Sequence, residues 1–589
     1  MNDKITHYTP TETVPAHVAG RNRLEEWQAS QPPNYFTADS DLQRKLELYL
    51  GKEKYVATAP HLYKFGQTAA SEIDPLVREA NLPHNNPFLN RFDGFGRRLE
   101  DVEFHPSHHA AGRLIYGGRP MAVLGEMGNW KLALSLFYLS SQNGEAGHNC
   151  PLACTAGIIK VLQHVAPAPL REKYLGRLLD PNYDTNFNGA QYLTEVQGGS
   201  DVGANSVWAR PEDTDSDIWY LTGEKWFCSN VTADLALVTA RMGHEEGTRG
   251  LGLFLVPRQL ENGEVNNFTI RRLKDKLGTR SMASAELDFR DALGYHVGSF
   301  KDALQHVINT SRIYNAIGCT ANGRRALTIA WTYAQNRLAF GQPIIRFPLV
   351  QAQLARMRTD CAAMLAGSLR IAKVMDDIEL GRASEADRAF FRMAVNLNKY
   401  RTAVLAHEVI MTAIEILGGN GAIESFSVLP RLLRDNIVFE NWEGTHNVLL
   451  AQVQRDIRKY AIHEPFLAHI RQLFQAANFP ELKLEGLAQV EIIAQELGEV
   501  LAMDELTAAI YFRPLMDRLT DLYYTACMAA VSTAETLETT TTLCLGKFAS
   551  PTSSKTLPGA LASLRLVVSA QTTIVWMRLW FKRLSWMTT

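Results

Sequence analysis

Cysteine is scarce in this 589-residue sequence, which has seven, at positions 150, 154, 228, 319, 361, 527 and 544. Their odd number and wide scatter predict reduced thiols in an intracellular protein, not a disulfide framework. Cys150 and Cys154 lie close together, but no second pair of cysteines or histidines completes a zinc pattern. We therefore expect no metal site. Between a cytoplasmic and a mitochondrial location the sequence does not decide.

The sequence also lacks an excess of charge of either sign. Its 60 Lys and Arg residues nearly balance 62 Asp and Glu residues, for a net charge of −2 at pH 7. No global field therefore argues for nucleic acid or an anionic membrane as a partner. From Ala461 to Thr589, ten basic residues stand against twelve acidic ones, and the one basic cluster is Arg578, Lys582 and Arg583. We expect no strong binding of duplex DNA by this region.

Apolar runs long enough to span a bilayer are missing. The apolar tail, residues 573–586, is too short and too charged to do so, and is either an edge of the C-terminal domain or a membrane-surface helix. It follows a threonine run (539–542) and a Pro/Ser segment (550–554), which predict loop. Residues 1–14 are polar, unlike a signal or transit peptide. The sequence therefore predicts no transmembrane segment and shows no targeting signal.

Three common catalytic motifs are missing as well. No Gly-x-Gly-x-x-Gly follows a strand pattern, no Walker loop is present, and there is no Gly-x-Ser-x-Gly elbow. These absences argue against Rossmann dinucleotide-binding proteins, P-loop NTPases and α/β-hydrolases.

Hydrophobic periodicity divides the chain into regions. Residues 1–50 are rich in proline and are expected to be irregular, and helical spacing then dominates to about residue 180. From about 190 to 289, short β-branched and aromatic runs between turns predict a compact antiparallel β-domain. Helical spacing returns at 301–458 and again at about 465–530. We predict four domains, at 1–185, 186–300, 301–458 and 459–589.

One eleven-residue stretch, Asn441–Ala451, lies where a charged apolar run meets a new helical pattern. Gly444 permits close backbone approach there, and the free N–H groups of the new helix point outwards. The carboxylate of Glu443 is thus held at a fixed angle to a molecule bound at the helix end. Taken alone, an acid near a helix N-terminus is better explained by its interaction with the helix dipole.

Other stretches favour a functional interpretation. Asn441–Asn447 resembles the catalytic loop of the acyl-CoA dehydrogenases, where the glutamate of a Tyr/Trp-Glu-Gly-Thr/Ser motif is the base, and Glu415–Gly421 resembles their glycine-rich flavin loop. Asp101–His109 and Cys150–Thr155 resemble the AidB-like branch of that family. The resemblance implies an α+β fold: an N-terminal helical domain, a middle antiparallel β-domain, a C-terminal four-helix bundle, and an extra C-terminal helical domain.

The resemblance also implies FAD as cofactor. Tyr192–Asp201 is similar to the family's Thr-Glu-x-x-x-Gly-Ser-Asp segment, and its hydroxyls and open backbone suit a flat heterocycle and a phosphate. In Gly223–Asn230, the tryptophan matches one that covers the flavin ring, and Ser229 is expected to replace Cys228 as donor to flavin N5. Without the resemblance, these are a surface turn and a core tryptophan. Flavin contacts are predicted for Tyr192, Leu193, Thr194, Gly199, Ser200, Trp226, Phe227 and Ser229.

A further set matches residues that bind the adenine and pyrophosphate of the flavin of a neighbouring subunit. An arginine pairs with a pyrophosphate and an aromatic ring packs on adenine, although Arg337 alone is as well explained by the helix dipole. Pro348 replaces a glutamine often found in the family. The match implies a homotetramer, a dimer of dimers. The predicted cofactor residues of this set and the catalytic loop are Arg337, Phe340, Glu415, Ile416, Leu417, Gly418, Gly419, Trp442, Thr445 and Asn447.

On the substrate side, the resemblance implies contacts from Ser200, Arg280, Arg312 and Gly444. The two arginines are explained equally well as structural ion-pair partners. The implied reaction is the α,β-dehydrogenation of a fatty acyl-CoA to the trans-2-enoyl-CoA, with Glu443 removing the α-proton and FAD taking the β-hydride. Electrons then pass to an electron-transfer flavoprotein.

Two other functions stay open at this point. The chain can be a flavoprotein with little turnover that sequesters fatty acyl chains or binds DNA in a stress response. It can also be an acyl-CoA oxidase, which differs only in the access of oxygen to reduced flavin. Glu443 favours the dehydrogenase, whereas the extra domain favours a binding module.

Overall fold

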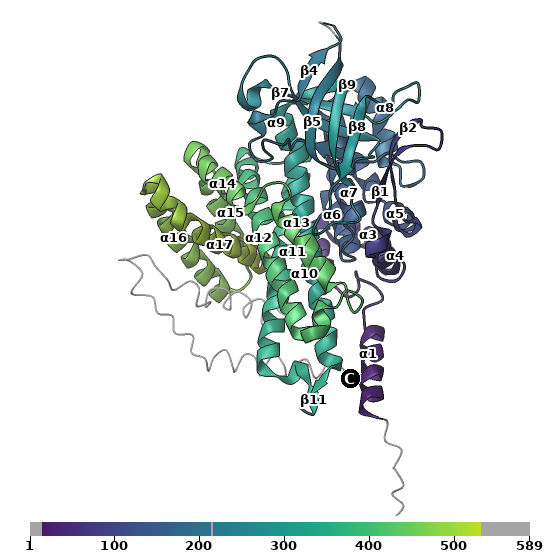
Figure 1. Ribbon diagram of the computed structural model, residues 1–589. Coiled ribbons are helices and arrows are strands. Elements are labelled where there is room, and N and C mark those ends of the chain that lie inside the picture. Colours follow the sequence, from purple (N-terminus) through teal and green to yellow (C-terminus); the bar gives the residue numbers. More distant parts are fainter. Residues whose placement is uncertain (1–14, 214–215, 532–589) are drawn as a thin grey trace, which may run out of the picture.

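The computed structural model describes residues 15–213 and 216–531. A β-domain lies at one end of a long helical bundle, N-terminal helices flank both, and the last helices pack along the side of the bundle (Figure 1). This is the order of helical, β, helical and extra helical parts that the sequence predicts. The predicted boundaries at 300 and 458 fall one or two residues from the ends of secondary-structure elements, and the one at 185 falls in a loop.

The N-terminal part corrects two expectations. Residues 16–50 are largely helical, because their prolines lie at helix boundaries, where a missing N–H costs little: Pro15 caps α1, and Pro32 and Pro33 separate it from α2. A β-hairpin, β1 (Phe88–Phe92) with β2 (Arg98–Glu103), interrupts the predicted helical region. The helices are α1 (Ala16–Ala29), α2 (Ser40–Leu50), α3 (Lys52–Thr68), α4 (Asp74–Ala80), α5 (Pro106–Gly117), α6 (Trp130–Ser141), α7 (Ala146–His164) and α8 (Ala168–Leu179).

The β-domain is a seven-stranded sheet that closes on itself. β6 pairs with β7, β7 with β9, β9 with β5, β5 with β4, and β4 returns to β6 through a single bridge. The pairing is antiparallel except for that bridge and the β3–β6 pair, which is parallel. The strands are β3 (Gly189–Tyr192), β4 (Trp208–Pro211), β5 (Ile218–Ser229), β6 (Leu235–Arg241), β7 (Leu251–Pro257), β8 (Phe268–Leu273) and β9 (Ser284–Ser299).

The bundle is built around three long helices of 28, 32 and 33 residues. A small hairpin, β10 (Leu338–Ala339) with β11 (Gln342–Pro343), marks its far end (Figure 1). α12 has a mean hydropathy of 1.4 over a window long enough to cross a membrane, and half of that window is buried inside the protein. The main helices are α9 (Phe300–Asp302), α10 (Asn309–Asn336), α11 (Pro348–Glu379), α12 (Glu385–Leu417), α13 (Leu429–Asn441) and α14 (His446–Tyr460).

Up to residue 531, the extra part contains three helices: α15 (His463–Gln475), α16 (Pro480–Ala502) and α17 (Glu505–Ala530). They pack against α11 and α12, and Arg401 pairs with Asp521 across that contact at 2.8 Å. The predicted loops at 539–542 and 550–554, the apolar tail and its basic cluster lie outside the described residues.

Candidate active site

A cavity of about 1000 Å³ lies where the β-domain meets the bundle. α7, α10, α14 and the segments after β3 and within β5 supply its walls. Segments more than two hundred residues apart in sequence thereby contribute to one space. The residues predicted from sequence that line it are Leu193, Thr194, Gly199, Ser200, Phe227, Ser229, Arg312, Trp442, Glu443, Gly444 and Thr445.

Glu443 lies in the short loop between α13 and α14 with a φ of 59°, in the left-handed region that non-glycine residues rarely adopt. Such a conformation costs about 1–3 kcal/mol and persists where surrounding contacts enforce it. Lys399 on α12 enforces it: its Nζ donates to the carbonyl oxygens of Glu440, at 2.9 Å, and Gly444, at 2.8 Å. Arg312 Nε donates to the carbonyl of Glu443 at 3.2 Å. The loop is thus clamped from two helices.

Three donors converge on one oxygen of the Glu443 carboxylate. Ser311 Oγ and Trp442 Nε1 each donate to Oε1 at 3.0 Å, and Gln191 Nε2 donates to the same atom. Among the described residues, Oε2 accepts no hydrogen bond. The carboxylate is thereby fixed through Oε1 in the wall of the cavity.

The electrostatics of this corner suit a proton acceptor. Burial raises the pKa of Glu443 above its ordinary value of 4.5, although Arg312, Ser311 and Trp442 oppose the shift. Burial lowers the pKa of Arg312 to about 10 and that of Lys399 to about 8. A carboxyl with a raised pKa beside two cations is a stronger base than an exposed glutamate and still ionises.

The β-domain side of the cavity is held by a buried ion pair. Lys225 Nζ lies 2.7 Å from Glu195 Oε1 and 3.1 Å from the carbonyl of Leu193, which it fixes in the cavity wall. Thr194 follows in the same wall, and a Cβ added to Gly199 would lie 3.1 Å from its hydroxyl oxygen. The turn therefore needs the small residue at Gly199.

The Trp226 side chain lies outside the cavity. Phe227 and Ser229 line the cavity, whereas Trp226 stacks on Lys274, 3.5 Å from its ring centroid, and Cys228 is buried in the β-domain core. Side chains alternate between the two faces of a strand, and the irregularity of β5 between Lys225 and Cys228 shifts that alternation at this point. The aromatic ring beside the cavity belongs to Phe227, and the hydroxyl two residues on belongs to Ser229.

Three other predicted residues point away from the cavity. On β3 the same alternation sends Tyr192 into the β-domain core, where its hydroxyl donates to the carbonyl of Asn230 at 3.2 Å. Arg280 is exposed and donates to the carbonyl of Lys276 at 2.9 Å. Asn447 is exposed on α14.

The remaining predicted residues lie at the far end of the bundle, near the β10–β11 hairpin (Figure 1). Phe340 is 97% exposed, and Arg337 is also exposed. Glu415, Ile416 and Leu417 end α12, Gly418 and Gly419 begin the next turn, and Gln353 Nε2 donates to Glu415 at 2.8 Å. The predicted flavin residues thus form two groups at opposite ends of the bundle.

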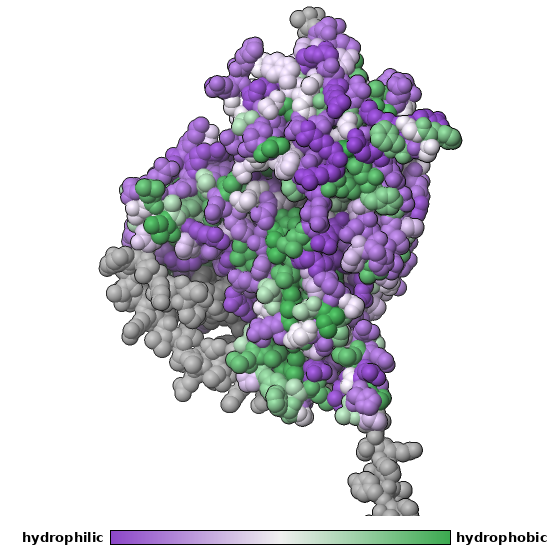
Figure 2. All heavy atoms as spheres, in the orientation of Figure 1, coloured by the Kyte–Doolittle hydropathy of each residue, from purple (hydrophilic) through white to green (hydrophobic). Residues whose placement is uncertain are grey.

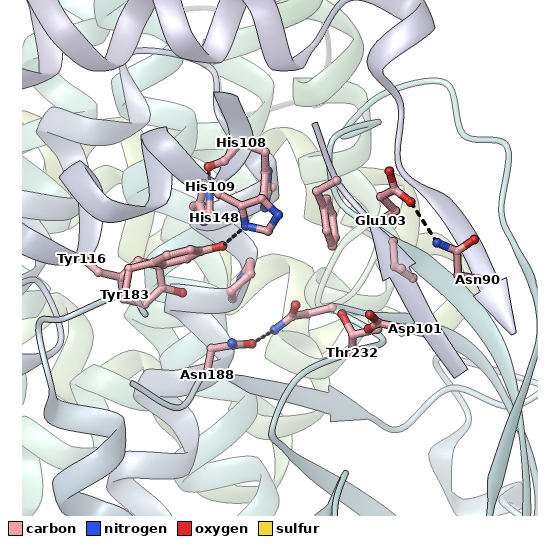
Figure 3. A pocket seen from close by; sticks show the side chains of 15 residues that line it. Asn90, Asp101, Glu103, His108, His109, Tyr116, His148, Tyr183, Asn188 and Thr232 are labelled. Carbon is pink, nitrogen blue, oxygen red and sulfur yellow. Dashed lines mark hydrogen bonds between the residues drawn. The ribbon is translucent and has the colours of Figure 1, made fainter. Parts of the chain in front are cut away.

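A second cavity, of about 390 Å³, lies beside α7 and is lined mainly by polar side chains (Figure 3). His108 stacks on His148, with ring centroids 4.0 Å apart, and His109 Nδ1 lies 3.0 Å from the Tyr183 hydroxyl. Burial lowers the pKa of His148 to about 4, so the cluster is neutral near pH 7. Within the part of the chain that the structure describes, no group of three His, Cys, Asp or Glu side chains is arranged to hold a metal ion. This cavity lies between the N-terminal domain and the β-domain, which also contributes to its lining.

Three consecutive parts of the chain match known protein families. Residues 300–458 match the acyl-CoA dehydrogenase C-terminal domain and residues 190–292 its middle domain, while residues 27–185 match the N-terminal domain of the adaptive response protein AidB. The AidB protein of Escherichia coli (strain K12) is 34% identical over 411 residues, 67% of this chain and 73% of that protein. The chain belongs to the acyl-CoA dehydrogenase family.

Two further relatives extend the match to the C-terminal helices. Acyl-CoA dehydrogenase family member 11 of Caenorhabditis elegans is 31% identical over 80% of this chain and 78% of its own length. The crystal structure of C. elegans ACDH-11 in complex with C11-CoA superposes with a TM-score of 0.80, at 26% identity, over 93% of this chain and 95% of that one. The predicted AidB-like branch and the fold class are confirmed.

As a member of the acyl-CoA dehydrogenase family, the chain is an FAD-dependent oxidoreductase. The cavity residues fit that cofactor: the Phe227 ring, 46% exposed, presents an aromatic surface, and Thr194, Ser200 and Ser229 present hydroxyls beside it. The flavin role of each residue stays a prediction. The sequence pattern missed Gln191, Ser311 and Lys399, which no local motif marks.

Proposed function

We propose that this protein oxidises a fatty acyl-CoA thioester to the trans-2-enoyl-CoA, with Glu443 as the base that removes the α-proton. The observation that carries the proposal is the Glu443 carboxylate, whose pKa is raised by burial and which is fixed in the wall of the cavity through a single oxygen. A sequestering protein has no need of a clamped carboxylate in a strained backbone conformation.

The chain's own residues supply position and field. Glu443 takes the α-proton of the thioester, and its backbone N–H polarises the thioester carbonyl, because both groups on one residue reach neighbouring atoms of the substrate. Thr194, Ser200, Phe227 and Ser229, which line the same cavity, would hold the flavin. When bound, FAD supplies the two-electron oxidation by accepting the β-hydride. Trp442 beside Glu443 donates to Oε1 and so helps to keep the carboxylate in place.

The proposal extends to assembly, electron transfer and location. Phe340 and Leu349, 97% and 82% exposed, form part of an apolar surface at the far end of the bundle (Figure 2). If that end holds the flavin of a neighbouring subunit, Arg337, Phe340 and Glu415–Gly419 acquire a role in a homotetramer. We propose an electron-transfer flavoprotein as the electron acceptor and an intracellular location, cytoplasmic or mitochondrial, which suits the free cysteines among the described residues.

The direct test is anaerobic titration with acyl-CoAs of graded length. We expect a yellow protein with one FAD per subunit whose flavin absorbance bleaches with at least one chain length, because the base and the flavin residues line one cavity. ACDH-11, solved with C11-CoA, suggests medium-length chains as the starting point. Unbleached flavin across the series would contradict dehydrogenation, and rapid reoxidation of bleached enzyme in air would identify an oxidase.

The DNA-binding alternative makes an opposite prediction. From Ala461 to Thr589 acidic residues outnumber basic ones, and of the ten basic residues Arg471 and Arg518 are paired with Glu491 and Glu496. Few cations remain to displace counterions from phosphates, so we expect no submicromolar duplex binding at about 150 mM salt, where surface fields are largely screened. Fluorescence anisotropy of a labelled duplex, repeated at low salt, checks this. Submicromolar binding at the higher salt would favour the alternative.

A further inference from the structure

Gln191 lies on β3, a strand that pairs with β6 in the β-domain, yet its side chain reaches the catalytic loop of the helical bundle. Its Nε2 donates to Glu443 Oε1 and to Ser311 Oγ, the latter at 3.2 Å. Glu443 is 252 residues away in sequence. This is the contact by which the flavin-holding domain touches the carboxylate of the base.

The other end of the same amide has no partner. Gln191 Oε1 is buried and accepts no hydrogen bond from the described residues. A buried acceptor without a donor is unfavourable, and a turned amide would place Oε1 against Glu443 and Ser311 instead. A carboxylate cannot donate to that oxygen, so the charged form of Glu443 holds the amide with its nitrogen forward. The orientation of Gln191 thus depends on the charge of Glu443.

Resting on the proposed function, we propose that Gln191 is a positioning residue for the base: it holds Oε1 of Glu443, so that Oε2 is the oxygen that takes the α-proton. In that step the α-carbon–hydrogen bond breaks and an Oε2–hydrogen bond forms. The electron pair left on the α-carbon enters the new α,β double bond as the β-hydride departs to FAD. Oε1 stays an acceptor throughout, so its three donors keep their bonds before and after the transfer.

The charged and titratable groups around Glu443 make the readout specific. Arg312 on α10 and Lys399 on α12 favour the carboxylate, and the carboxylate in turn raises the pKa of Cys154 on α7, which burial also raises. Against this fixed background, Gln191 is the neutral donor from the β-domain. Its removal destabilises the charged form of Glu443 and raises the pKa of that residue. The acid limb, the pH range over which the rate of flavin reduction falls on acidification, therefore moves to higher pH.

The experiment compares Gln191→Met and Gln191→Glu with the unaltered protein, as holoenzymes. The rate of flavin reduction by saturating acyl-CoA is measured anaerobically between pH 5 and 9. We expect Gln191→Met to slow reduction by about tenfold or more, from the loss of a hydrogen bond to a charged group. Gln191→Glu places two carboxylates together and moves the acid limb upward by about one pH unit or more.

A matched control exists on α16, where Gln489 Nε2 donates to Glu485 at 3.0 Å far from the cavity. Gln489→Met and Gln489→Glu should leave both the rate and the acid limb unchanged. Ser311→Ala removes another donor to Oε1 and should shift the limb in the same direction. If the Gln191 variants lose their flavin, the acid limb of Ser311→Ala still tests whether donors to Oε1 position the base.

Two outcomes separate this inference from the proposed function. If Glu443→Gln is inactive while the Gln191 variants and Ser311→Ala keep the rate within twofold and the limb in place, the positioning role is wrong and the base stands. If Glu443→Gln reduces its flavin normally, the base assignment fails and the inference falls with it.

Discussion

Glu443→Gln is expected to retain flavin and fold but to lose reduction by acyl-CoA by a factor of about 10² to 10⁴, the usual contribution of a general base. The amide has nearly the shape of the carboxylate and can still accept from Ser311 and Trp442 through its oxygen. It cannot take the α-proton. Stopped-flow bleaching under anaerobic conditions measures the loss, and bound flavin absorbance checks that the cavity is intact.

The control for this substitution lies three residues earlier. Glu440 contacts His407, with 2.7 Å between Oε1 and Nδ1, and His446, at 3.2 Å, instead of the cavity. Glu440→Gln therefore changes a nearby carboxylate, in the last turn of α13 just before the loop, without touching the proposed reaction. We expect it to bleach at nearly the normal rate. Equal losses in both variants would mean that loop geometry, and not the base, was disturbed.

Local sequence signals predicted much of the fold. The apolar β-branched runs at 235–240 and 251–256 are β6 and β7. Short apolar runs of this kind between turns are typical of strands that are buried on both faces of a sheet. The Trp442–Thr445 segment is the predicted junction between two helices. Helices α1 and α2 were missed, because the prolines were taken as breakers although Pro15 precedes α1 and Pro32 and Pro33 lie between the two helices.

The register of side chains was harder to predict than the strands themselves. The motif around Trp226 was correctly placed on a strand, but which residue faces the flavin cavity depends on a single residue of register. The family resemblance predicted flavin contacts for Trp226, Phe227 and Ser229, and the structure places the last two in the cavity wall.

The support of the catalytic loop has no sequence signature at all. Lys399 lies inside an apolar helix and Ser311 inside another, and each is an ordinary residue until the fold brings it to Glu443. Such contacts join positions 41 to 252 residues apart, which no periodicity records. A residue that reacts is therefore easier to predict from sequence than the residues that hold it in place.

Lys225→Met is expected to destabilise the β-domain by about 3–5 kcal/mol, because it leaves Glu195 as a buried carboxylate without its partner. Both side chains are almost fully buried, with Nζ and Oε1 2.7 Å apart. Burial alone would raise the pKa of Glu195, yet Lys225 and hydrogen bonds hold it below its ordinary value. Urea unfolding followed by tryptophan fluorescence measures the change in the free energy of unfolding.

Two controls separate the lost charge pair from a general loss of packing. Lys173→Met breaks the exposed pair with Glu261, at 2.5 Å, and should cost only about 0–1 kcal/mol. The double variant Lys225→Met with Glu195→Gln removes the orphaned charge and should recover part of the loss. Because Lys225 also holds the Leu193 carbonyl beside the predicted flavin segment, the single variant should release flavin more readily on dilution. A destabilised protein that keeps its flavin fully would show that this segment does not hold the cofactor.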